Sequence, residues 1–470
     1  MDKIKLAVIG GGPGGYAAAF LAADLGMEVT LIDKEKNPGG VCLYRGCIPS
    51  KALLHVAKLI NEAEEAKNWG IDFSKPKIDL NKLRDWKNSV VNKLTGGLGI
   101  VSKQRKINFI RGTASFVNSS KLKIEKFDGG IEELSFDKVI IATGSEIATI
   151  PFLNIESKRI LNSTTALDLP EIPNKLLVIG GGYIGLELGS VYNALGTKVS
   201  VVEMMPGLLP GADRDLVAFL AKNINKKFEK VMVNSKVLSL KEVKDGINVS
   251  FQDGEGNVTE QVYDYVLMSI GRKPVTNGLG LGNTKVKINS KGWIIINHQL
   301  QTDDPNIYAI GDIAGEPMLA HKASHEGKIA VEAIAGHKVA FEPQAIPAVV
   351  FTDPEIAWAG LTETKAREQN IKFEIAKFPW AASGRATTLD RSDGVTKLII
   401  DPDSERILGV GICGPGAGEL IAEAVLAIEM GANVTDLKLT IHPHPTLSET
   451  IMEAAETFFG QSTHMYKPKK

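Results

Sequence analysis

Cysteine is the scarcest residue with reactive chemistry in this sequence, which has three in 470 residues. So few cysteines exclude the disulfide framework of small secreted proteins, and the expected compartment is the cytoplasm, where thiols stay reduced. Two of the three, Cys42 and Cys47, nevertheless lie in one short segment. In a reducing compartment such a pair is more typical of redox chemistry than of a structural crosslink.

An excess of either charge is also absent, because 54 basic residues face 55 acidic ones. Without a net field, the surface has no general attraction for polyanions, which argues against nucleic acid and anionic membranes as partners. Residues 6–23 form an uncharged run, but this run contains Pro13 and five glycines. These residues break a membrane-spanning helix and argue against a signal peptide. The expected partners are small molecules and proteins.

What the sequence does contain is one unit that occurs twice. Residues 6–33, LAVIGGGPGGYAAAFLAADLGMEVTLID, match residues 176–203, LLVIGGGYIGLELGSVYNALGTKVSVVE, without a gap. Each copy predicts an apolar strand, a glycine-rich turn, a helix and a second strand that ends in an acid. The glycines of the two G-x-G-x-x-G turns are Gly10, Gly12 and Gly15 in the first copy and Gly180, Gly182 and Gly185 in the second.

This repeated pattern is typical of dinucleotide-binding units. Glycine permits a tight turn and a close approach of the backbone to a pyrophosphate, which the N–H groups at the start of the helix stabilise. The terminal acids, Asp33 and Glu203, are expected to accept hydrogen bonds from a ribose. No arginine or lysine directly follows Glu203, which favours NAD over NADP in the second copy. Two dinucleotides on one chain suggest that electrons pass between them.

Three further apolar strands each lead into a glycine, and they are predicted within residues 139–145, 266–272 and 307–315. Gly144 and Gly271 fit either a nucleotide site or an ordinary turn at the end of a strand. Asp312 fits either a contact with the ribityl hydroxyls of a flavin or the N-cap of a helix. These residues are candidates for cofactor binding.

Past about residue 341 the pattern changes to alternating strands followed by an apolar helix, which predicts a separate α+β domain that is free to serve association. The strands are predicted at residues 348–352, 355–360, 396–401 and 406–414, and the helix at residues 418–431. Cys413 lies in the last of these strands and is predicted to be a core thiol. His321 and His325 have helical spacing, but no further ligand follows them, which argues against a metal site.

The segment around the cysteine pair predicts a reactive thiol at the start of a helix. In a regular helix, Cys42 and Cys47 would be separated by about 7.5 Å of rise alone, too far for a disulfide. A bridge therefore requires an irregular turn, which Gly46 permits. Pro49 suits the first helical turn, which places Cys47 beside free N–H groups that favour a thiolate. The alternative is a pair of buried thiols or an inert clip.

The chain resembles the flavoprotein disulfide reductases over nearly its whole length, and most closely those members that oxidise dihydrolipoamide. The resemblance rests on GGVCLYRGCIPSK at residues 39–51, both glycine turns, Gly311–Asp312, and HPHPTLSE at residues 442–449. It implies an α/β fold with two Rossmann-like dinucleotide-binding domains plus a C-terminal α+β dimerisation domain. The implied domains are 1–148 for FAD, 149–271 for NAD, 272–344 as a central domain that completes the FAD site, and 345–470 for the interface.

The resemblance also implies a role for each site residue. Cys42 is implied to exchange with dihydrolipoamide and Cys47 to face the flavin, while Lys51 lies near the flavin and pairs with Glu187 close to the nicotinamide. His444, before a cis proline, is implied to act as the base on the disulfide of the other subunit of a homodimer. Glu449 is implied to orient His444, although Thr446 and Glu449 also match a capping box. His442 is a competing candidate for the base.

The implied partner is the lipoyl domain of a 2-oxo acid dehydrogenase acyltransferase, or a glycine-cleavage complex. The chain departs from the usual pattern at Tyr44 and Arg45, where an asparagine and a small apolar residue are common, and at Tyr183, where an aliphatic residue is more common. Arg45 either raises the positive potential at the thiols or points to solvent. The alternatives are a glutathione reductase, which needs basic residues after Glu203, and a flavoprotein scaffold without activity.

Overall fold

The computed structural model describes residues 3–466 of the chain. The first copy of the repeat forms strand β1 (Lys5–Ile9), helix α1 (Pro13–Asp24) and strand β2 (Glu28–Asp33), and the two strands pair in parallel. The turn after β1 requires a glycine, because Gly10 has a φ of +105° and a side chain there would lie 2.3 Å from the carbonyl oxygen of Ala142. The predicted order of strand, turn and helix is confirmed.

The second copy repeats this geometry. Strand β9 (Lys175–Ile179), helix α6 (Tyr183–Ala194) and strand β10 (Lys198–Val202) form the same parallel unit. Gly180 has a φ of +104°, and a side chain there would lie 2.5 Å from the carbonyl oxygen of Ser269. The two matching stretches of sequence therefore impose the same backbone path twice.

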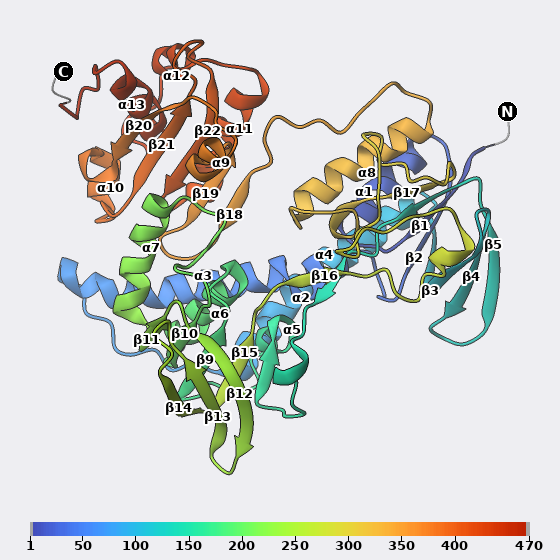
Figure 1. Cartoon of the computed structure of the whole chain (residues 1–470), viewed down its shortest axis with the longest axis horizontal. Coiled ribbons are helices and arrows are strands. Elements are labelled where there is room, and N and C mark those ends of the chain that lie inside the picture. The colour runs from blue at the N-terminus through green and yellow to red at the C-terminus, as the bar shows by residue number, and fades with distance from the viewer. Residues whose placement is uncertain (1–2, 467–470) are drawn as a thin grey trace.

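The first sheet has seven strands in the order β17-β6-β1-β2-β3-β4-β5. Residues 272–344 return to this sheet, because β17 (Ile307–Ala309) pairs in parallel with β6 (Lys138–Ile141) and helix α8 (Ala320–Ile334) packs on α1. The remaining elements of this region are β3 (Asn108–Asn118), β4 (Lys121–Lys126), β5 (Ile131–Ser135) and the helices α3 (Cys47–Glu65) and α4 (Leu80–Gln104). Figure 1 shows α3 extending away from this sheet toward the other units.

The second sheet has five parallel strands in the order β11-β10-β9-β15-β8 and is accompanied by an antiparallel sheet of β12, β13 and β14. Their bounds are β8 (Ile160–Asn162), β11 (Lys230–Met232), β12 (Lys236–Val243), β13 (Gly246–Gln252), β14 (Val258–Tyr263) and β15 (Tyr265–Met268). A two-stranded ribbon of β7 (Ser145–Ile147) and β16 (Arg272–Pro274) connects the two nucleotide-binding regions.

The C-terminal unit is the predicted α+β domain. Its antiparallel sheet has the order β18-β19-β22-β21-β20, and helices α11 (Ala417–Glu429) and α13 (Glu449–Phe458) pack on it. The strands are β18 (Ala348–Val350), β19 (Ile356–Gly360), β20 (Glu374–Pro379), β21 (Val395–Ile400) and β22 (Ile407–Cys413). The sequence pattern missed β20, an edge strand that carries charges and ends in proline. Cys413 is fully buried, which confirms the predicted core thiol.

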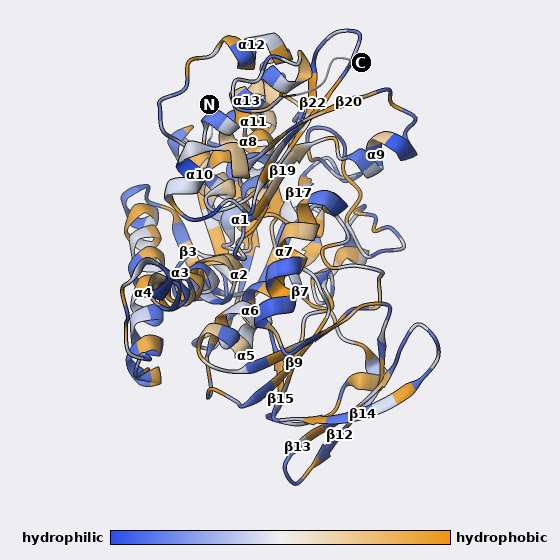
Figure 2. Cartoon of the chain, turned by 90° about the vertical axis from the view of Figure 1, so that its left-hand side faces the viewer, coloured by the Kyte–Doolittle hydropathy of each residue, from blue (hydrophilic) through white to orange (hydrophobic). Residues whose placement is uncertain are grey.

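The hydropathy of the chain follows this layering (Figure 2). Hydrophobic residues concentrate in central strands such as β19 and β22, whereas the outer helix α9 (Glu363–Glu368) is hydrophilic. Among residues 3–466, no helix is both long enough and apolar enough to cross a lipid bilayer.

Helix α7 (Arg214–Lys227) joins the second nucleotide-binding unit to the C-terminal sheet. Its buried face includes Leu216 and Leu220, which share one hydrophobic core with Ile356 and Val395 of the C-terminal unit. Leu216 fills the space in which a side chain at Gly411 would otherwise lie, at 2.6 Å. Figure 1 shows α7 reaching from the lower sheet to the C-terminal sheet.

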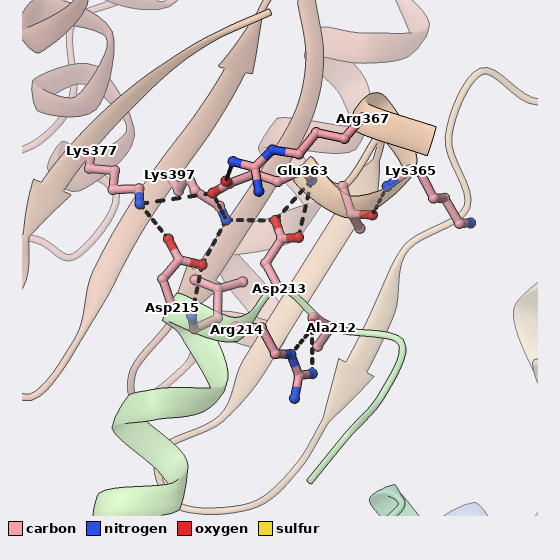
Figure 3. A network of polar contacts seen from close by, with 11 residues as sticks. Ala212, Asp213, Arg214, Asp215, Glu363, Lys365, Arg367, Lys377 and Lys397 are labelled. Atoms are coloured by element: carbon pink, nitrogen blue, oxygen red, sulfur yellow. Dashed lines mark hydrogen bonds and ion pairs between the residues drawn. The ribbon is translucent and has the colours of Figure 1, made fainter. Parts of the chain in front are cut away.

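A buried charge network closes this contact at the start of α7 (Figure 3). Lys397 on β21 is completely buried, and its Nζ lies 2.6 Å from Asp213, 2.8 Å from Asp215 and 3.0 Å from Glu363. Lys377 on β20 lies 2.6 Å from the other oxygen of Asp215. Lys397 thus contacts three carboxylates that come from two units of the chain, and it is the cation paired with the buried Asp213.

We expect Lys397→Met to lower the free energy of unfolding by about 3–5 kcal/mol, because it leaves buried carboxylates without their cation. Urea denaturation measures this loss. The matched control is Lys372→Met on the same domain, whose pair with Asp403 at 2.8 Å is exposed on both sides and is expected to contribute about 0–1 kcal/mol. Equal losses in the two variants would contradict a special role for the buried network.

Candidate active site

Each glycine turn is closed by the acid at the end of its unit. Asp33 accepts a hydrogen bond from the backbone N–H of Gly11 at 2.5 Å, and Glu203 accepts one from Gly181 at 2.7 Å. Burial raises the pKa of Asp33, although hydrogen bonds from the backbone oppose this shift. Both acids therefore lie at the edge of their sheet where a ribose would follow a bound pyrophosphate.

A cavity of about 460 Å³ begins at the first glycine turn and extends to the start of α6. Its lining includes nine of the predicted site residues: Gly10, Gly12, Asp33, Cys42, Cys47, Lys51, Gly144, Glu187 and Asp312. Glu187 and Tyr183 of α6 line its other end. The cavity thus joins the first glycine turn, the cysteine pair and the first turns of the helix that follows the second glycine turn.

Other predicted residues lie outside this cavity. Gly15 packs on the carbonyl oxygen of Gly10, so its role is the close contact of helix and strand. Gly271 has a φ of +117° in the turn between β15 and β16. A second hollow of about 290 Å³, lined by Met204 and Asn234, lies beyond Glu203 at the end of β10. Gly180, Gly182 and Gly185 surround the start of α6.

The residues of the first unit fit a dinucleotide with a polyol chain. Gly12 is the N-cap of α1 and provides no side-chain cap, so the N–H groups of the first turn are available to a phosphate. The close contact of Gly12 and Gly40 leaves no room for a side chain, since a Cβ on Gly40 would lie 2.5 Å from Gly12 Cα. Asp33 and Asp312 provide carboxylates at two places along the cavity.

The two cysteines lie on either side of an irregular turn, as predicted. Cys42 is in helix α2 (Gly40–Arg45), Cys47 is the first residue of α3, and Gly46 between them has a non-helical backbone. A side chain at Gly46 would lie 2.9 Å from the carbonyl oxygen of Val41. Both cysteines are free thiols, and both line the cavity.

The thiols differ in acidity. The hydrogen bond from Cys42 and the charge of Lys51 lower the pKa of Cys47 to about 7, against the effect of burial. The hydrogen bond to Cys47 and burial raise the pKa of Cys42. Near neutral pH the pair therefore holds its negative charge on Cys47, at the start of α3, where the helix dipole also favours an anion.

Lys51 lies one turn beyond Cys47 and forms an ion pair with Glu187 at 2.9 Å. Glu187 is 3% exposed and also accepts hydrogen bonds from Ser50 Oγ at 3.0 Å and from the backbone N–H of Phe351 at 3.0 Å. Lys51 Nζ lies 4.4 Å from the centre of the Phe351 ring. Sequence reasoning missed Ser50 and Phe351. The motif around Lys51 contains Ser50, but no local signal points to Phe351, which is distant in sequence.

Asp312 accepts a hydrogen bond from Ser145 Oγ, and Arg272 donates to the same Ser145 oxygen at 2.7 Å. The short helix η4 (Gly311–Ile313) has Ile310 as its N-cap and includes Asp312 in its first turn. The N-cap alternative for Asp312 is therefore wrong. Its carboxylate faces the cavity instead, and Ser145 and Arg272 are site residues that the sequence pattern did not indicate.

Tyr44 and Arg45 fix the loop after β2. Arg45 forms an ion pair with Glu35, and the Tyr44 hydroxyl donates to the carbonyl oxygen of Asn37 at 3.1 Å. The positive charge of Arg45 is thus compensated by a neighbouring carboxylate.

His444 lies in the loop before α13 and belongs to the C-terminal unit. Its Nδ1 lies 2.9 Å from Glu449, the side chain is 72% exposed, and the bond to Pro445 is cis as predicted. The second carboxylate oxygen of Glu449 accepts from the backbone N–H of Thr446 at 2.8 Å. The pKa of Glu449 is lowered. Partial burial raises this pKa, but the hydrogen bonds from Thr446 and His444 outweigh that effect. Glu449 therefore holds His444 and the backbone of Thr446 together. The capping-box alternative is wrong, because the N-cap of α13 is Ser448, whose side chain does not cap the helix.

His442 has a different environment, because both of its ring nitrogens are occupied. Nδ1 contacts the carbonyl oxygen of Thr440 at 2.9 Å, and Nε2 lies 2.7 Å from Glu423. Its side chain is 4% exposed. A buried imidazole with two partners is not available to a substrate thiol, which leaves His444 as the candidate base.

Comparisons with known proteins show the family of the chain. The family model for pyridine nucleotide-disulphide oxidoreductases matches residues 4–327, and the model for their dimerisation domain matches residues 346–455. The chain is 49% identical to a dihydrolipoyl dehydrogenase of Haemophilus influenzae over 467 residues, which covers 99% of this chain and 97% of the relative. It is 45% identical to the dihydrolipoyl dehydrogenase of Geobacillus stearothermophilus, with 97% of each chain covered.

Solved structures show the same architecture. LpdA from Mycobacterium tuberculosis has a TM-score of 0.90 at 27% identity and covers 97% of this chain and 99% of its own. The flavoprotein disulfide reductase RclA from Escherichia coli has a TM-score of 0.85 at 27% identity, with 95% of this chain and 98% of its own covered. Since the family models together match most of the described sequence, the chain belongs to the pyridine nucleotide-disulphide oxidoreductase family.

Proposed function

We propose that this chain is a dihydrolipoyl dehydrogenase, which oxidises dihydrolipoamide with NAD by way of FAD and the Cys42–Cys47 pair. The observation that carries this proposal is the position of two free cysteines on either side of the irregular turn at Gly46, at the start of a helix and inside the cavity that begins at the first glycine turn. Relatives that match this chain over nearly their whole length are named dihydrolipoyl dehydrogenase, which supports the same substrate.

The proposed reaction begins with the cysteines as a disulfide. A thiolate of dihydrolipoamide attacks Cys42 Sγ, the bond between the cysteines breaks, and Cys47 leaves as a thiolate. Cys47 is suited to leave because the thiol with the lower pKa is the better leaving group. The second substrate thiol then attacks the lipoyl sulfur of the mixed disulfide, which releases lipoamide and Cys42. FAD held in the cavity would supply the acceptor for the two electrons of the reduced pair, and NAD held at the second repeat would supply the final hydride acceptor.

His444 is proposed to take the proton of the attacking substrate thiol. Free thiols have a pKa of about 8.5, so a neighbouring imidazole increases the fraction that reacts at neutral pH. The bond from Nδ1 to Glu449 leaves Nε2 free to accept this proton, as in a triad. His444 lies before α13 in the C-terminal unit, whereas the cysteines lie in α2 and α3, and the second subunit of a homodimer is proposed to supply the histidine.

The cofactor sites follow the two repeats. We assign FAD to residues 1–148 together with 272–344, where Gly10, Gly12, Gly15, Asp33, Lys51, Gly144 and Asp312 are the proposed contacts. We assign NAD to residues 149–271, where Gly180, Gly182, Gly185, Glu203 and Gly271 are the proposed contacts. Residues 345–470 are assigned to the dimer interface, in line with the family model for that region.

The proposed partner is the lipoyl domain of an acyltransferase in a 2-oxo acid dehydrogenase complex, or the lipoyl carrier of a glycine-cleavage complex. Both present the same dithiol on a flexible arm. The proposed compartment is the cytoplasm, which the low cysteine content supports.

One pair of assays tests the proposal. The FAD-loaded protein should form NADH from dihydrolipoamide, and it should prefer NAD over NADP by at least about 100-fold, because Glu203 would face the 2′-phosphate of NADP and juxtaposed like charges cost several kcal/mol. Oxidation of NADPH by glutathione disulfide would favour a glutathione reductase instead. Absence of turnover in both assays would favour a scaffold without activity.

A further inference from the structure

Helix α8 contacts the first glycine turn directly. A side chain at Gly327 of α8 would lie 2.5 Å from the carbonyl oxygen of Gly14 in α1, so the two helices cross backbone to backbone. Ser324 Oγ of the same helix donates a hydrogen bond to the carbonyl oxygen of Pro13 at 3.2 Å. The position of α8 thus fixes the beginning of α1, where the proposed FAD phosphates bind.

The same helix carries a buried ion pair behind the wall of the cavity. Lys322 Nζ lies 2.7 Å from Glu326, and the two side chains are 6% and 3% exposed. The second oxygen of Glu326 accepts a hydrogen bond from the backbone N–H of Gly311 at 2.6 Å. Lys322 also donates to the carbonyl oxygen of Gly315 at 3.4 Å. The pair therefore holds both ends of the turn at residues 311–315, which contains Asp312.

A buried ion pair contributes little net stability to the fold. A need to hold the turn at residues 311–315 in one conformation would explain why this pair is there. Removing a carboxylate and an ammonium from water carries a penalty that their mutual attraction often only balances. Burial raises the pKa of Glu326, and the charge of Asp312 adds to this shift, while Lys322 opposes it. A fully satisfied buried network does, however, fix the geometry of the groups that it contacts.

We propose that Lys322 and Glu326 are positioning residues for FAD, which hold Asp312 in register with the glycine turn of α1. They act through Gly311, because the residues of α8 that line the cavity are their neighbours Ala320 and Ala323. Gly311 itself has a φ of +75° and lies against Ala323, where a Cβ would be 3.1 Å from the alanine Cβ. The inference rests on the proposed FAD site, and it adds two residues that support this site without lining the cavity.

Two double variants separate the hydrogen bond from the charges. Lys322→Met/Glu326→Leu removes both charges and the acceptor for Gly311, whereas Lys322→Met/Glu326→Gln removes the charges but keeps a carbonyl oxygen at the same reach. FAD is removed from each purified protein, and the dissociation constant is measured by quenching of flavin fluorescence during reconstitution. We expect the leucine variant to bind FAD about 10- to 100-fold more weakly, and the glutamine variant to remain within about threefold of the parent protein.

Asp312→Ala shows whether the effect passes through Asp312. In the Asp312→Ala background, the leucine variant should weaken FAD binding by less than about threefold further, because the group that it positions is absent. Fully additive losses would overturn the proposal. If the leucine variant does not fold, Glu326→Asp takes its place, since its shorter side chain cannot reach Gly311, and the same ranking against the glutamine variant is expected.

The matched control is Lys397→Met, which also breaks a buried ion pair but lies in the network at the start of α7 (Figure 3). It is expected to lower stability without changing the affinity for FAD. If the leucine variant binds FAD as tightly as the parent protein, or if the glutamine variant loses affinity equally, the positioning role is wrong. A parent protein that binds no FAD would instead contradict the proposed function itself.

Discussion

With Cys42 replaced by serine, the FAD-loaded protein is expected to show a long-wavelength charge-transfer band without any substrate, whereas Cys47→Ser shows none. Both variants are expected to lose at least about 10³-fold of the activity with dihydrolipoamide, because the exchange needs both sulfurs. The band requires a thiolate beside oxidised flavin, and Cys47 is the thiol whose pKa is lowered, to about 7. Absorption spectra of the two purified variants distinguish the cysteines.

The pH dependence of this band has a defined sign. A thiol is protonated below its pKa, so the band should weaken as the pH falls through about 7 and approach its maximum well above that value. The serine at position 42 still offers a hydroxyl that can donate to the Cys47 thiolate in place of the lost thiol. Cys413→Ser is the control, because this thiol is buried in the C-terminal core, and no band is expected from it. A band in Cys47→Ser alone would reverse the two assignments.

The features that the sequence predicted well are those that short stretches impose on the backbone. The two glycine turns need a positive φ at Gly10 and at Gly180, and a side chain at either position would collide with a neighbouring carbonyl oxygen. At the break between the cysteines, Gly46 has a non-helical backbone without a positive φ, and a side chain there would lie 2.9 Å from the carbonyl oxygen of Val41. The positive φ at Gly10 and Gly180 and the contact of Gly46 with Val41 are local constraints, so they leave a pattern that one sequence reveals. The carbonyl oxygens of Ala142 and Ser269, which exclude a side chain at the two turns, are distant in sequence.

The features that were missed depend on segments that are distant in sequence. Phe351 reaches Glu187 through its backbone N–H, which carries no signature of residue type. Ser145 of β7 donates to Asp312, and Arg272 reaches Ser145 because β16 pairs with β7. The sequence also did not predict the role of Glu326. Lys322 and Glu326 have the helical spacing of an ion pair, but this spacing does not show that the pair is buried. Here the tertiary arrangement decides which polar groups become buried together.

Asp312 illustrates a local pattern that fits two structures. An acid after a glycine at the end of a strand is common at the start of a helix, and the sequence alone left the N-cap open. In the structure the backbone has already turned into η4 before Asp312, so its side chain faces Ser145 and the cavity. The choice between the two depended on a two-residue difference in where the short helix begins, because its N-cap is Ile310.

Mixing two inactive variants, Cys47→Ser and His444→Gln, should restore activity once their subunits exchange. In a symmetric dimer each proposed site takes its cysteines from one subunit and its histidine from the other. A heterodimer then contains one site with both cysteines and His444 intact and one site that lacks both functions. We expect each heterodimer to have about half of the activity of the unsubstituted dimer. An equal mixture with random exchange should reach about a quarter of that activity, because half of its dimers are heterodimers.

The reason for expecting a full return at one site is that the two substitutions act on different units of the chain. His444 lies before α13 in the C-terminal unit and is exposed, whereas Cys47 begins α3 beside the first sheet. Alone, His444→Gln should lose about 10² to 10⁴-fold of the activity, the usual contribution of a general base. The matched control mixes Cys42→Ser with Cys47→Ser, which leaves every heterodimer site with one damaged cysteine, so no activity should return. If native mass spectrometry shows that subunits exchange while the first mixture stays as inactive as its parents, then the base comes from the same subunit as the cysteines or is not His444.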